Sequence, residues 1–168
     1  WSQRVAIVVS NLNELVRRLC DADVDVVVVG GFAAVLHGST LVTRDLDVCT
    51  VLPPANVDKL RDILADLRPV HRMTPQRLSF LTNPDPGTPV QNLYLETDAG
   101  AIDFMTSITG IGDFNRIQAQ AVEIELFGHR CRVMSLADLI AAKLALGRDK
   151  DLLAARELQA IAERLKNR

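Results

Sequence analysis

The sequence predicts an α/β fold of the α+β type, with a mixed β-sheet, flanking helices and a pair of helices at the C-terminal end. Three observations support this class. Short β-branched runs such as residues 24–29 alternate with helical patterns, two hairpin patterns occupy the middle, and residues 136–165 carry apolar residues at helical spacing. The 168 residues fit a single domain over 1–168. We expect a core over about 22–134 and a helical part over 135–168.

The first half of the chain predicts helices and strands that are bounded by capping, Gly or Pro residues. Apolar residues at helical spacing indicate helices, and β-branched or alternating runs indicate strands. In chain order these are a helix that Ser10 caps, a buried strand over 24–29, a short helix over 32–37, a strand over 45–49 and an amphipathic helix over 57–67.

The second half predicts mainly hairpins and then helices. Turn residues fill 83–89, which we expect to be a surface loop. The other elements are a strand over 77–82, a hairpin of 93–96 with 101–105, a second hairpin of 121–127 with 130–134, and two helices that Ser135 opens and that meet near Gly147.

Composition and charge exclude several classes of protein. Apolar residues make up 48% and the formal net charge is -2, so bulk charge would not coat nucleic acid. No apolar run approaches the roughly 18 residues that span a bilayer, and no membrane association is expected. Cys20, Cys49 and Cys131 are too scattered for a disulfide framework and lack metal-site spacing. We expect free, buried thiols in a reducing cytoplasm.

Two carboxylates share one face of the strand over 45–49. Asp45 and Asp47 are two residues apart, so both point away from the core that Leu46 and Val48 enter. Adjacent carboxylates repel each other unless a cation lies between them, and Mg²⁺ prefers such oxygen ligands. An Asp-x-Asp pair also arises by chance, and the nearby run of Asp21, Asp23 and Asp25 is interpreted as a solvated turn.

A third carboxylate and a glycine pair complete the pattern. By the same alternation Asp103 lies outside the core, and it joins the pair if its strand neighbours the 45–49 strand. Three carboxylates can hold two metals, for the attacking and the leaving oxygen. Gly30-Gly31 lets the backbone approach a triphosphate closely, although Gly-Gly after a strand is often only a turn.

This order of motifs resembles the nucleotidyltransferase superfamily of the DNA polymerase β type. Residues 28–38 carry strand, Gly-Gly and helix, and residues 43–47 carry the Thr-x-Asp-x-Asp strand. The sequence is more specifically similar to small bacterial members, the AbiEii-like and type IV toxin–antitoxin nucleotidyltransferases. The resemblance extends to Asp103 as the third carboxylate and to 139–145 and 148–152, which resemble the lysine helix and the Lys-Asp motif of the family.

The lysine helix supplies two further candidates. Lys143 lies on an otherwise apolar helical stripe, where an ammonium group needs an anion. We expect it to contact the phosphates of the nucleotide, and the alternative is that it snorkels to the surface. Asp151 is expected to orient Lys143 or to cap the last helix. Arg44 is a candidate for gripping phosphate, because Leu41 stands where related sequences often have a basic residue.

The resemblance implies a Mg²⁺-dependent (or Mn²⁺-dependent) enzyme that moves a nucleoside monophosphate from an NTP to a hydroxyl. Asp45, Asp47 and Asp103 would bind metal, Asp103 would help to deprotonate the acceptor, and Gly30 and Gly31 would seat the triphosphate. The implied acceptors are a tRNA 3′ end or a protein side chain, in a toxin with a cognate antitoxin.

Other functions stay open. One is transfer to a small molecule of the antibiotic type, and another is a non-catalytic nucleotide-binding or regulatory module. A basic cluster of Arg68, His71, Arg72 and Arg77 is interpreted as a solvated face, or as a grip on an RNA backbone.

Overall fold

The computed structural model describes residues 2–126 and 128–168. The helices are α1 (Ser2–Asp21), α2 (Gly30–Leu36), α3 (Pro54–Leu64), the 3₁₀ turn η1 (Ala65–Leu67), α4 (Phe114–Gln120), α5 (Leu136–Leu146) and α6 (Asp149–Lys166). The strands are β1 (Val26–Val29), β2 (Asp45–Thr50), β3 (Val70–His71), β4 (Asn92–Thr97), β5 (Gly100–Met105), β6 (Ser107–Ile108), β7 (Gly112–Asp113), β8 (Val122–Leu126) and β9 (His129–Val133).

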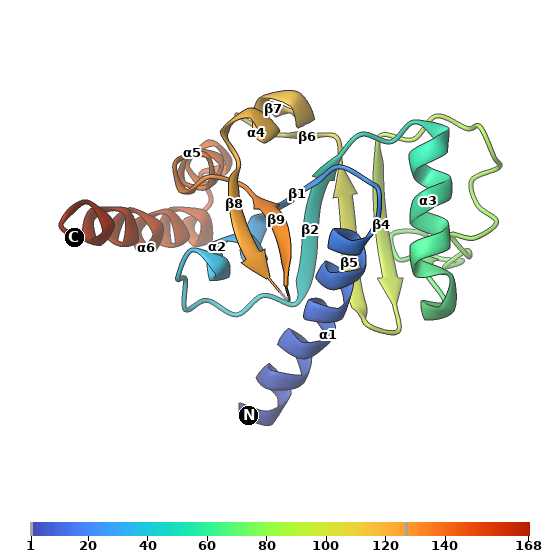
Figure 1. Cartoon of the computed structure of the whole chain (residues 1–168), viewed down its shortest axis with the longest axis horizontal. Helices are drawn as coiled ribbons and strands as arrows, with labels where there is room; N and C mark the ends of the chain where they lie inside the picture. Colours follow the sequence, from blue (N-terminus) through green and yellow to red (C-terminus); the bar gives the residue numbers. More distant parts are fainter. Residues whose placement is uncertain (1, 127) are drawn as a thin grey trace.

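Seven strands form one sheet in the order β3-β4-β5-β2-β1-β9-β8 (Figure 1). β2 pairs with β5 and β1 pairs with β9 in parallel, whereas β1–β2, β3–β4, β4–β5 and β8–β9 are antiparallel. The sheet is mixed and helices flank it, which confirms the predicted fold class. Both predicted hairpins are present, as β4–β5 and β8–β9. Phe127, the last residue of one predicted strand, lies outside the described residues.

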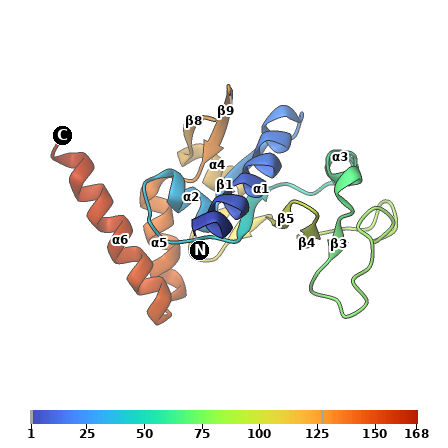
Figure 2. The ribbon, with the colours of Figure 1, turned by 90° about the horizontal axis from the view of Figure 1, so that it is seen from below.

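The helices are positioned by apolar stripes and by their caps. α1 packs against β2, β5 and β9, and α4 packs against β1 and β2. α5 and α6 pack on each other at one end of the molecule, and α3 lies with the 72–91 loop at the other (Figures 1 and 2). Ser135 accepts a hydrogen bond from the Asp138 backbone N–H, and Gly147 ends α5 in the left-handed conformation. The predicted helix pair that meets at Gly147 is confirmed.

Two local predictions are wrong, and one helix was not predicted. Ser10 does not open the first helix, because α1 continues back to Ser2. No strand covers 77–82: only Ser79 bridges to Val70, and the segment is held as a loop by the fully buried ring of Phe80. The short helix α4 was not predicted. Its buried Phe114 and Ile117 are too few to give a clear helical period.

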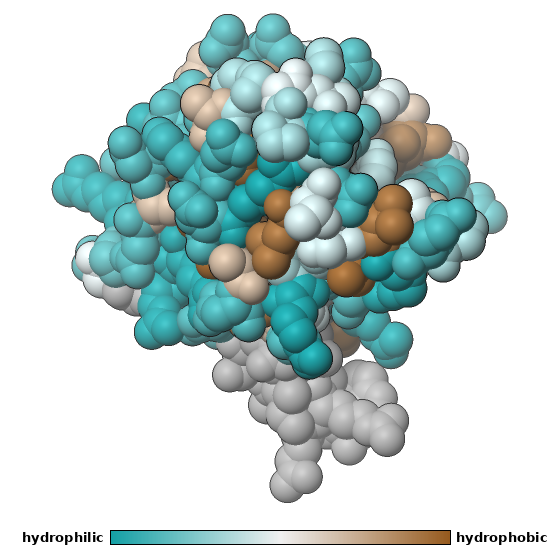
Figure 3. All heavy atoms as spheres, turned by 90° about the vertical axis from the view of Figure 1, so that its right-hand side faces the viewer, coloured by the Kyte–Doolittle hydropathy of each residue, from teal (hydrophilic) through white to brown (hydrophobic). Residues whose placement is uncertain are grey.

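The end of the molecule that carries α3 and the long loop is mainly hydrophilic. Figure 3 shows this side, with small apolar areas between polar side chains. Met73, Leu78 and Leu81 are among the exposed apolar residues of the loop. Scattered exposure of this kind is ordinary for a protein surface. Within the described residues, no helix is both long and apolar enough to cross a membrane.

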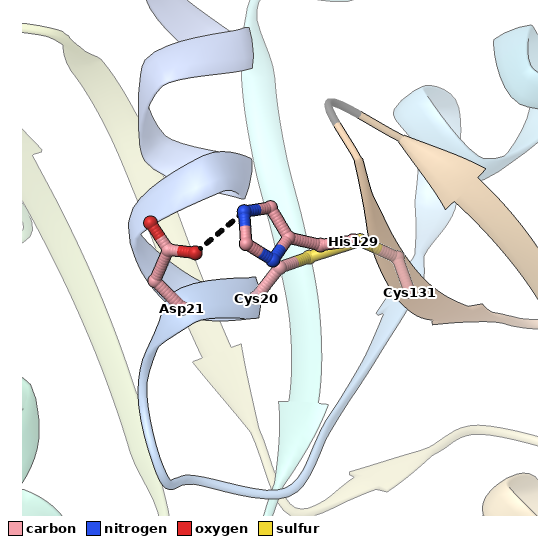
Figure 4. Close-up of a disulfide and its surroundings, with 4 residues drawn as sticks. All are labelled: Cys20, Asp21, His129 and Cys131. Carbon is pink, nitrogen blue, oxygen red and sulfur yellow. Dashed lines mark ion pairs between the residues drawn. A yellow bond between two sulfur atoms is a disulfide. The ribbon is translucent and has the colours of Figure 1, made fainter.

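The expectation of three free thiols is wrong. Cys20, at the end of α1, forms a disulfide with Cys131 of β9, and their Cα atoms are 6.0 Å apart (Figure 4). The two residues are 111 positions apart in sequence and meet only because α1 packs against β9. Asp21 and His129 form an ion pair beside the bridge, with 2.8 Å between Oδ1 and Nε2. Cys49 is free and buried, as predicted.

Candidate active site

The three predicted carboxylates come from two neighbouring strands in the centre of the sheet. β2 and β5 run parallel, and their register pairs Asp47 with Asp103. Asp45 lies two residues before Asp47 and shares its face, while Leu46 between them is fully buried. Asp45 is exposed, Asp47 is half-buried and Asp103 is buried. The structure therefore brings these three residues together on one face of the sheet.

The negative charges in this row are not fully balanced. Burial, followed by the charges of Asp103 and Asp45, raises the pKa of Asp47 to about 7. The positive charges of Arg72 and Lys143 oppose this shift without cancelling it. The raised pKa of Asp47 shows that negative charge is unfavourable at this carboxylate, so an added cation would be stabilised beside it.

Gly30 makes room for the Asp47 carboxylate. A Cβ built on Gly30 would overlap the carboxylate, and Asp47 Cβ would be only 3.0 Å away. Gly30 also has a φ of +65°, in the left-handed region that favours glycine. Next to it, a Cβ on Gly31 would lie 2.8 Å from Thr43 Oγ1. The glycine pair thus lies directly against the Asp-x-Asp strand and the loop before it.

Asp103 already has a strong partner, which the sequence did not reveal. Arg72, just after β3, donates from Nη1 to Oδ1 and from Nη2 to Oδ2, the second at 2.8 Å. The Arg72 Cζ atom lies 5.8 Å from the centre of the Tyr94 ring. As the side chains stand, no group of three or more acidic, cysteine or histidine residues in the described part of the chain is arranged to hold a metal ion.

The residues nevertheless fit a magnesium or manganese ion in their chemistry. The donor set is all carboxylate oxygen, which hard divalent cations prefer. Asp45 and Asp47 are in none of the ion pairs found among the described residues. Asp103 fits the same set once the Arg72 guanidinium turns away from it.

The C-terminal helices supply two cations beside the carboxylates. Lys143 of α5 is partly exposed, and its Nζ lies 3.7 Å from Asp151 Oδ1. Asp151 is 1% exposed and accepts from Arg148 Nε at 2.6 Å and from the Arg148 backbone N–H at 3.3 Å. Arg148 mainly, and Lys143 to a smaller extent, hold the pKa of Asp151 below its usual range. Asp151 thus forms an ion pair with Lys143 and also caps α6.

Two hollows meet at these cations. The larger, about 460 Å³, lies over the sheet, and its lining includes Gly30, Asp47, Tyr94, Lys143 and Arg148. The smaller, about 260 Å³, lies between α2, the 39–43 loop and α6. Lys143 and Arg148 line both hollows, so they stand between a pocket at Asp47, the one carboxylate of the three that lines it, and a pocket at Gly31.

The predicted phosphate-binding residue Arg44 does not line either hollow, and three residues that line the larger hollow were not predicted from the sequence. Arg44 is exposed and lines neither of these two hollows. Arg148 was not predicted, because its contact with Asp151 forms only when α6 begins at Asp149 and Arg148 is the N-cap residue. Asn92 and Tyr94 could have been found, since alternation along β4 exposes both, and Tyr94 pairs in register with Asp103.

Comparison with solved structures gives distant likenesses over nearly the whole chain. The crystal structure of TM1012 from Thermotoga maritima, assigned as a nucleotidyltransferase, has a TM-score of 0.52 and 18% identity, covering 94% of this chain and 91% of that one. At this identity the likeness shows the fold alone. Two structures of the antibiotic-resistance factor ANT(2″)-Ia have TM-scores of 0.46 and 14% identity. One is a solution structure that covers 99% of this chain and 96% of that one. The other, a crystal structure with adenylyl-2″-tobramycin, covers 94% and 98%.

Comparison with protein families gives a match over almost the full sequence. No protein with a curated description matches the chain. Residues 3–164 match the family described as nucleotidyltransferase of unknown function (DUF6036). The carboxylate row, the glycine pair and the neighbouring cations all fall within this span. The chain therefore belongs to this family of nucleotidyltransferases.

Proposed function

We propose that the protein transfers a nucleoside monophosphate from an NTP to a hydroxyl group and releases pyrophosphate, with Mg²⁺ or Mn²⁺ as cofactor. The observation that carries this proposal is the register of β2 and β5, which sets Asp47 beside Asp103 with Asp45 on the same face. Asp45 and Asp47, joined by Asp103, are the residues that would hold the cation. When bound, it would neutralise phosphate charge and increase the acidity of the acceptor hydroxyl.

The nucleotide is expected to occupy both hollows. The nucleoside lies in the larger one, where Met105, Ile108 and Leu146 offer apolar surface for a base. The triphosphate passes Lys143 and Arg148 toward the smaller one, whose lining also includes Gly31 and Lys150. These three cations suit an anion with several charges, and the missing Cβ at Gly31 lets the backbone approach it.

The reaction is a displacement at the α-phosphorus. The acceptor oxygen forms a bond to that phosphorus, and the bond from it to the bridging oxygen of pyrophosphate breaks. The hydroxyl proton moves to the Asp103 carboxylate, and pyrophosphate leaves with the electron pair of the broken bond. Lys143, held by Asp151, stabilises the negative charge on the leaving group. Positioning and charge thus supply most of the catalysis.

The hydroxyl that accepts the nucleotide belongs either to a macromolecule or to a small molecule. A toxin that acts on tRNA or on a protein, with a cognate antitoxin, remains a proposal from the sequence resemblance alone. Three of the four residues in the basic cluster offered for an RNA backbone already make contacts within the molecule, although the Arg68 pair is largely exposed. Arg68 binds Asp98, and Arg72 binds Asp103. His71 Nε2 lies 2.8 Å from the Asn83 carbonyl oxygen. These contacts reduce the support for an RNA acceptor, and a small hydroxylated molecule is the second candidate acceptor.

The test is transfer of label from α-³²P-labelled NTPs in the presence of Mg²⁺. Bulk tRNA, a protein extract and a set of polyhydroxylated small molecules are offered separately. We expect label in one acceptor class, with release of pyrophosphate, and none with Asp47→Asn. Binding of Mg²⁺ and NTP without transfer to any class would instead support the non-catalytic module. Label transfer that survives Asp47→Asn would contradict the assigned site.

A further inference from the structure

Arg72 is built into the sheet at the edge of the carboxylate row. Its backbone N–H donates to the Tyr94 carbonyl at 3.0 Å, which fixes the main chain beside β4. Its side chain crosses β4 to reach Asp103 on β5, with the guanidinium beside the Tyr94 ring. The exposed fractions of the two side chains are 21% for Arg72 and 10% for Asp103. The pair is therefore mostly removed from water, where a charge-assisted bidentate contact is strong.

The same pair keeps Asp103 from acting as a metal ligand. Both carboxylate oxygens accept from one guanidinium, and a divalent cation at the same oxygens would be repelled by that fixed positive charge. Without any cation, however, Asp103 would be a buried carboxylate with two further carboxylates beside it, which is strongly unfavourable. Arg72 supplies the missing charge as long as no metal does.

The geometry lets the guanidinium leave without disturbing the fold. Asp103 sits on a central strand and need not move. Arg72 opens the 72–91 loop, and its own side chain is 21% exposed, so solvent already reaches part of it. Rotation of the Arg72 side chain alone would uncover Asp103, while the backbone bond to Tyr94 stays in place.

We propose that Arg72 is a displaceable counter-ion. Its guanidinium neutralises Asp103 in the metal-free protein and moves away from that carboxylate when a divalent cation binds there. Arg72 thereby lowers the affinity of the site for metal and stabilises the empty site. This inference rests on the proposed function, because it takes Asp103 to be the third carboxylate of the metal site. Arg72 is here a positioning residue, since it acts through Asp103.

A second arginine provides a matched control. Arg68 makes the same bidentate contact with Asp98, at 2.9 and 3.0 Å, but this pair lies at the turn between β4 and β5 and is largely exposed. Arg68→Gln removes one positive charge and one bidentate pair without touching the carboxylate row. Arg72→Gln removes one positive charge next to the carboxylate row. Arg72→Lys keeps the positive charge but loses the bidentate guanidinium contact.

The test is the dissociation constant for Mn²⁺ alone, without nucleotide, measured from the electron paramagnetic resonance signal of free Mn²⁺. We expect Arg72→Gln to bind Mn²⁺ at least about fivefold more tightly than the wild type, because a nearby positive charge is gone. Arg72→Lys should lie between them and Arg68→Gln should equal the wild type. In EDTA the urea midpoint of Arg72→Gln should be lower than that of the wild type, and Mn²⁺ should restore it.

Different results separate this inference from the proposed function. Equal or weaker Mn²⁺ binding by Arg72→Gln, with the wild type binding normally, overturns the role of Arg72 and leaves the metal site standing. If Arg72→Gln does not fold in EDTA, the Mn²⁺ affinity of Arg72→Lys is the deciding measurement. An Arg72→Lys protein that binds Mn²⁺ no more tightly than the wild type overturns the inference. If none of the proteins binds Mn²⁺ at millimolar concentration, the metal site of the proposed function fails as well.

Discussion

Lys143 and Asp151 form an ion pair across the junction of α5 and α6, with 3.7 Å between Nζ and Oδ1. The carboxylate is almost fully buried and is shared with Arg148. A lysine on an apolar stripe is thus neither buried alone nor simply directed to solvent. It is held at the boundary between the two hollows, where its charge faces any anion that enters.

This arrangement predicts that Lys143→Met weakens NTP binding far more than it weakens the fold. The ion pair with Asp151 is long, so its loss should change stability by less than about 1 kcal/mol. Loss of a charge beside the phosphates should raise the dissociation constant of Mg²⁺–NTP by about tenfold or more. Isothermal titration calorimetry measures the affinity. Lys166→Met, which removes a surface cation near Glu163, is the control and should bind normally. Equal affinities for the two variants would contradict the role of Lys143.

Asp47→Asn should stabilise the metal-free protein while abolishing transfer. Burial and the neighbouring carboxylates raise the pKa of Asp47 to about 7, from an ordinary value of 3.8. The folded state therefore binds the proton more tightly than the unfolded state, and stability falls as pH rises from about 4 to about 7. At about pH 8 in EDTA we expect the variant to gain about 1–2 kcal/mol, after allowing for partial exposure.

Urea unfolding measures that difference, with Asp45→Asn as the comparison. Asp45 is exposed, so its change should have a smaller effect. A metal-free Asp47→Asn protein that is less stable than the wild type would show that the carboxylate row is not under charge repulsion.

The Cys20–Cys131 disulfide should contribute substantially to stability. A disulfide typically contributes about 2–4 kcal/mol because it restricts the unfolded chain, and a bridge between residues 111 positions apart is expected at the upper end of this range or above it. Cys131→Ser and reduction of the wild type should lower the melting temperature by similar amounts. Cys49→Ala keeps the bridge and should remain sensitive to reductant. A wild-type protein whose three cysteines are all alkylated after unfolding without reductant would contradict the pairing.

Glu157 makes a pH-dependent contact between α6 and the loop that lines the smaller hollow. The Ser39 and Thr40 hydroxyls donate to its carboxylate and hold its pKa below the usual 4.5. The stabilising effect is therefore present above about pH 4.5 and is lost as pH falls through the lowered pKa. Glu157→Gln should be less stable than the wild type near neutral pH, with the difference shrinking in acid. Urea titrations at several pH values measure this, and a difference that grows in acid would rule it out.

The sequence could predict what depends on neighbours along one strand. Alternation on β2 and β5 placed Asp45, Asp47 and Asp103 on one face, and only the pairing of the two strands had to be assumed. The Gly30-Gly31 turn followed from local chemistry in the same way. The helix pair around Gly147 was marked by a cap and a glycine, which are local signals as well.

What the sequence could not predict depends on contacts between distant segments. Arg72 reaches Asp103 across 31 positions, from a loop that follows a strand of only two residues. Cys20 and Cys131 meet through packing of α1 on β9, and no rule of cysteine spacing predicts a pair that is 111 residues apart in sequence. The phosphate contact expected of Arg44 stays a prediction. Arg44 directly precedes Asp45 in sequence, but its side chain is exposed and lines neither hollow.

The central claim is that the carboxylate row binds a nucleotide through a divalent cation. It is tested most directly by calorimetric binding of a non-hydrolysable NTP to the wild type and to Asp47→Asn, each with Mg²⁺ and with EDTA. We predict binding by the wild type that depends on Mg²⁺, and a loss of at least about tenfold in affinity for Asp47→Asn. Binding that is as tight in EDTA as in Mg²⁺, or unchanged by Asp47→Asn, would contradict the account.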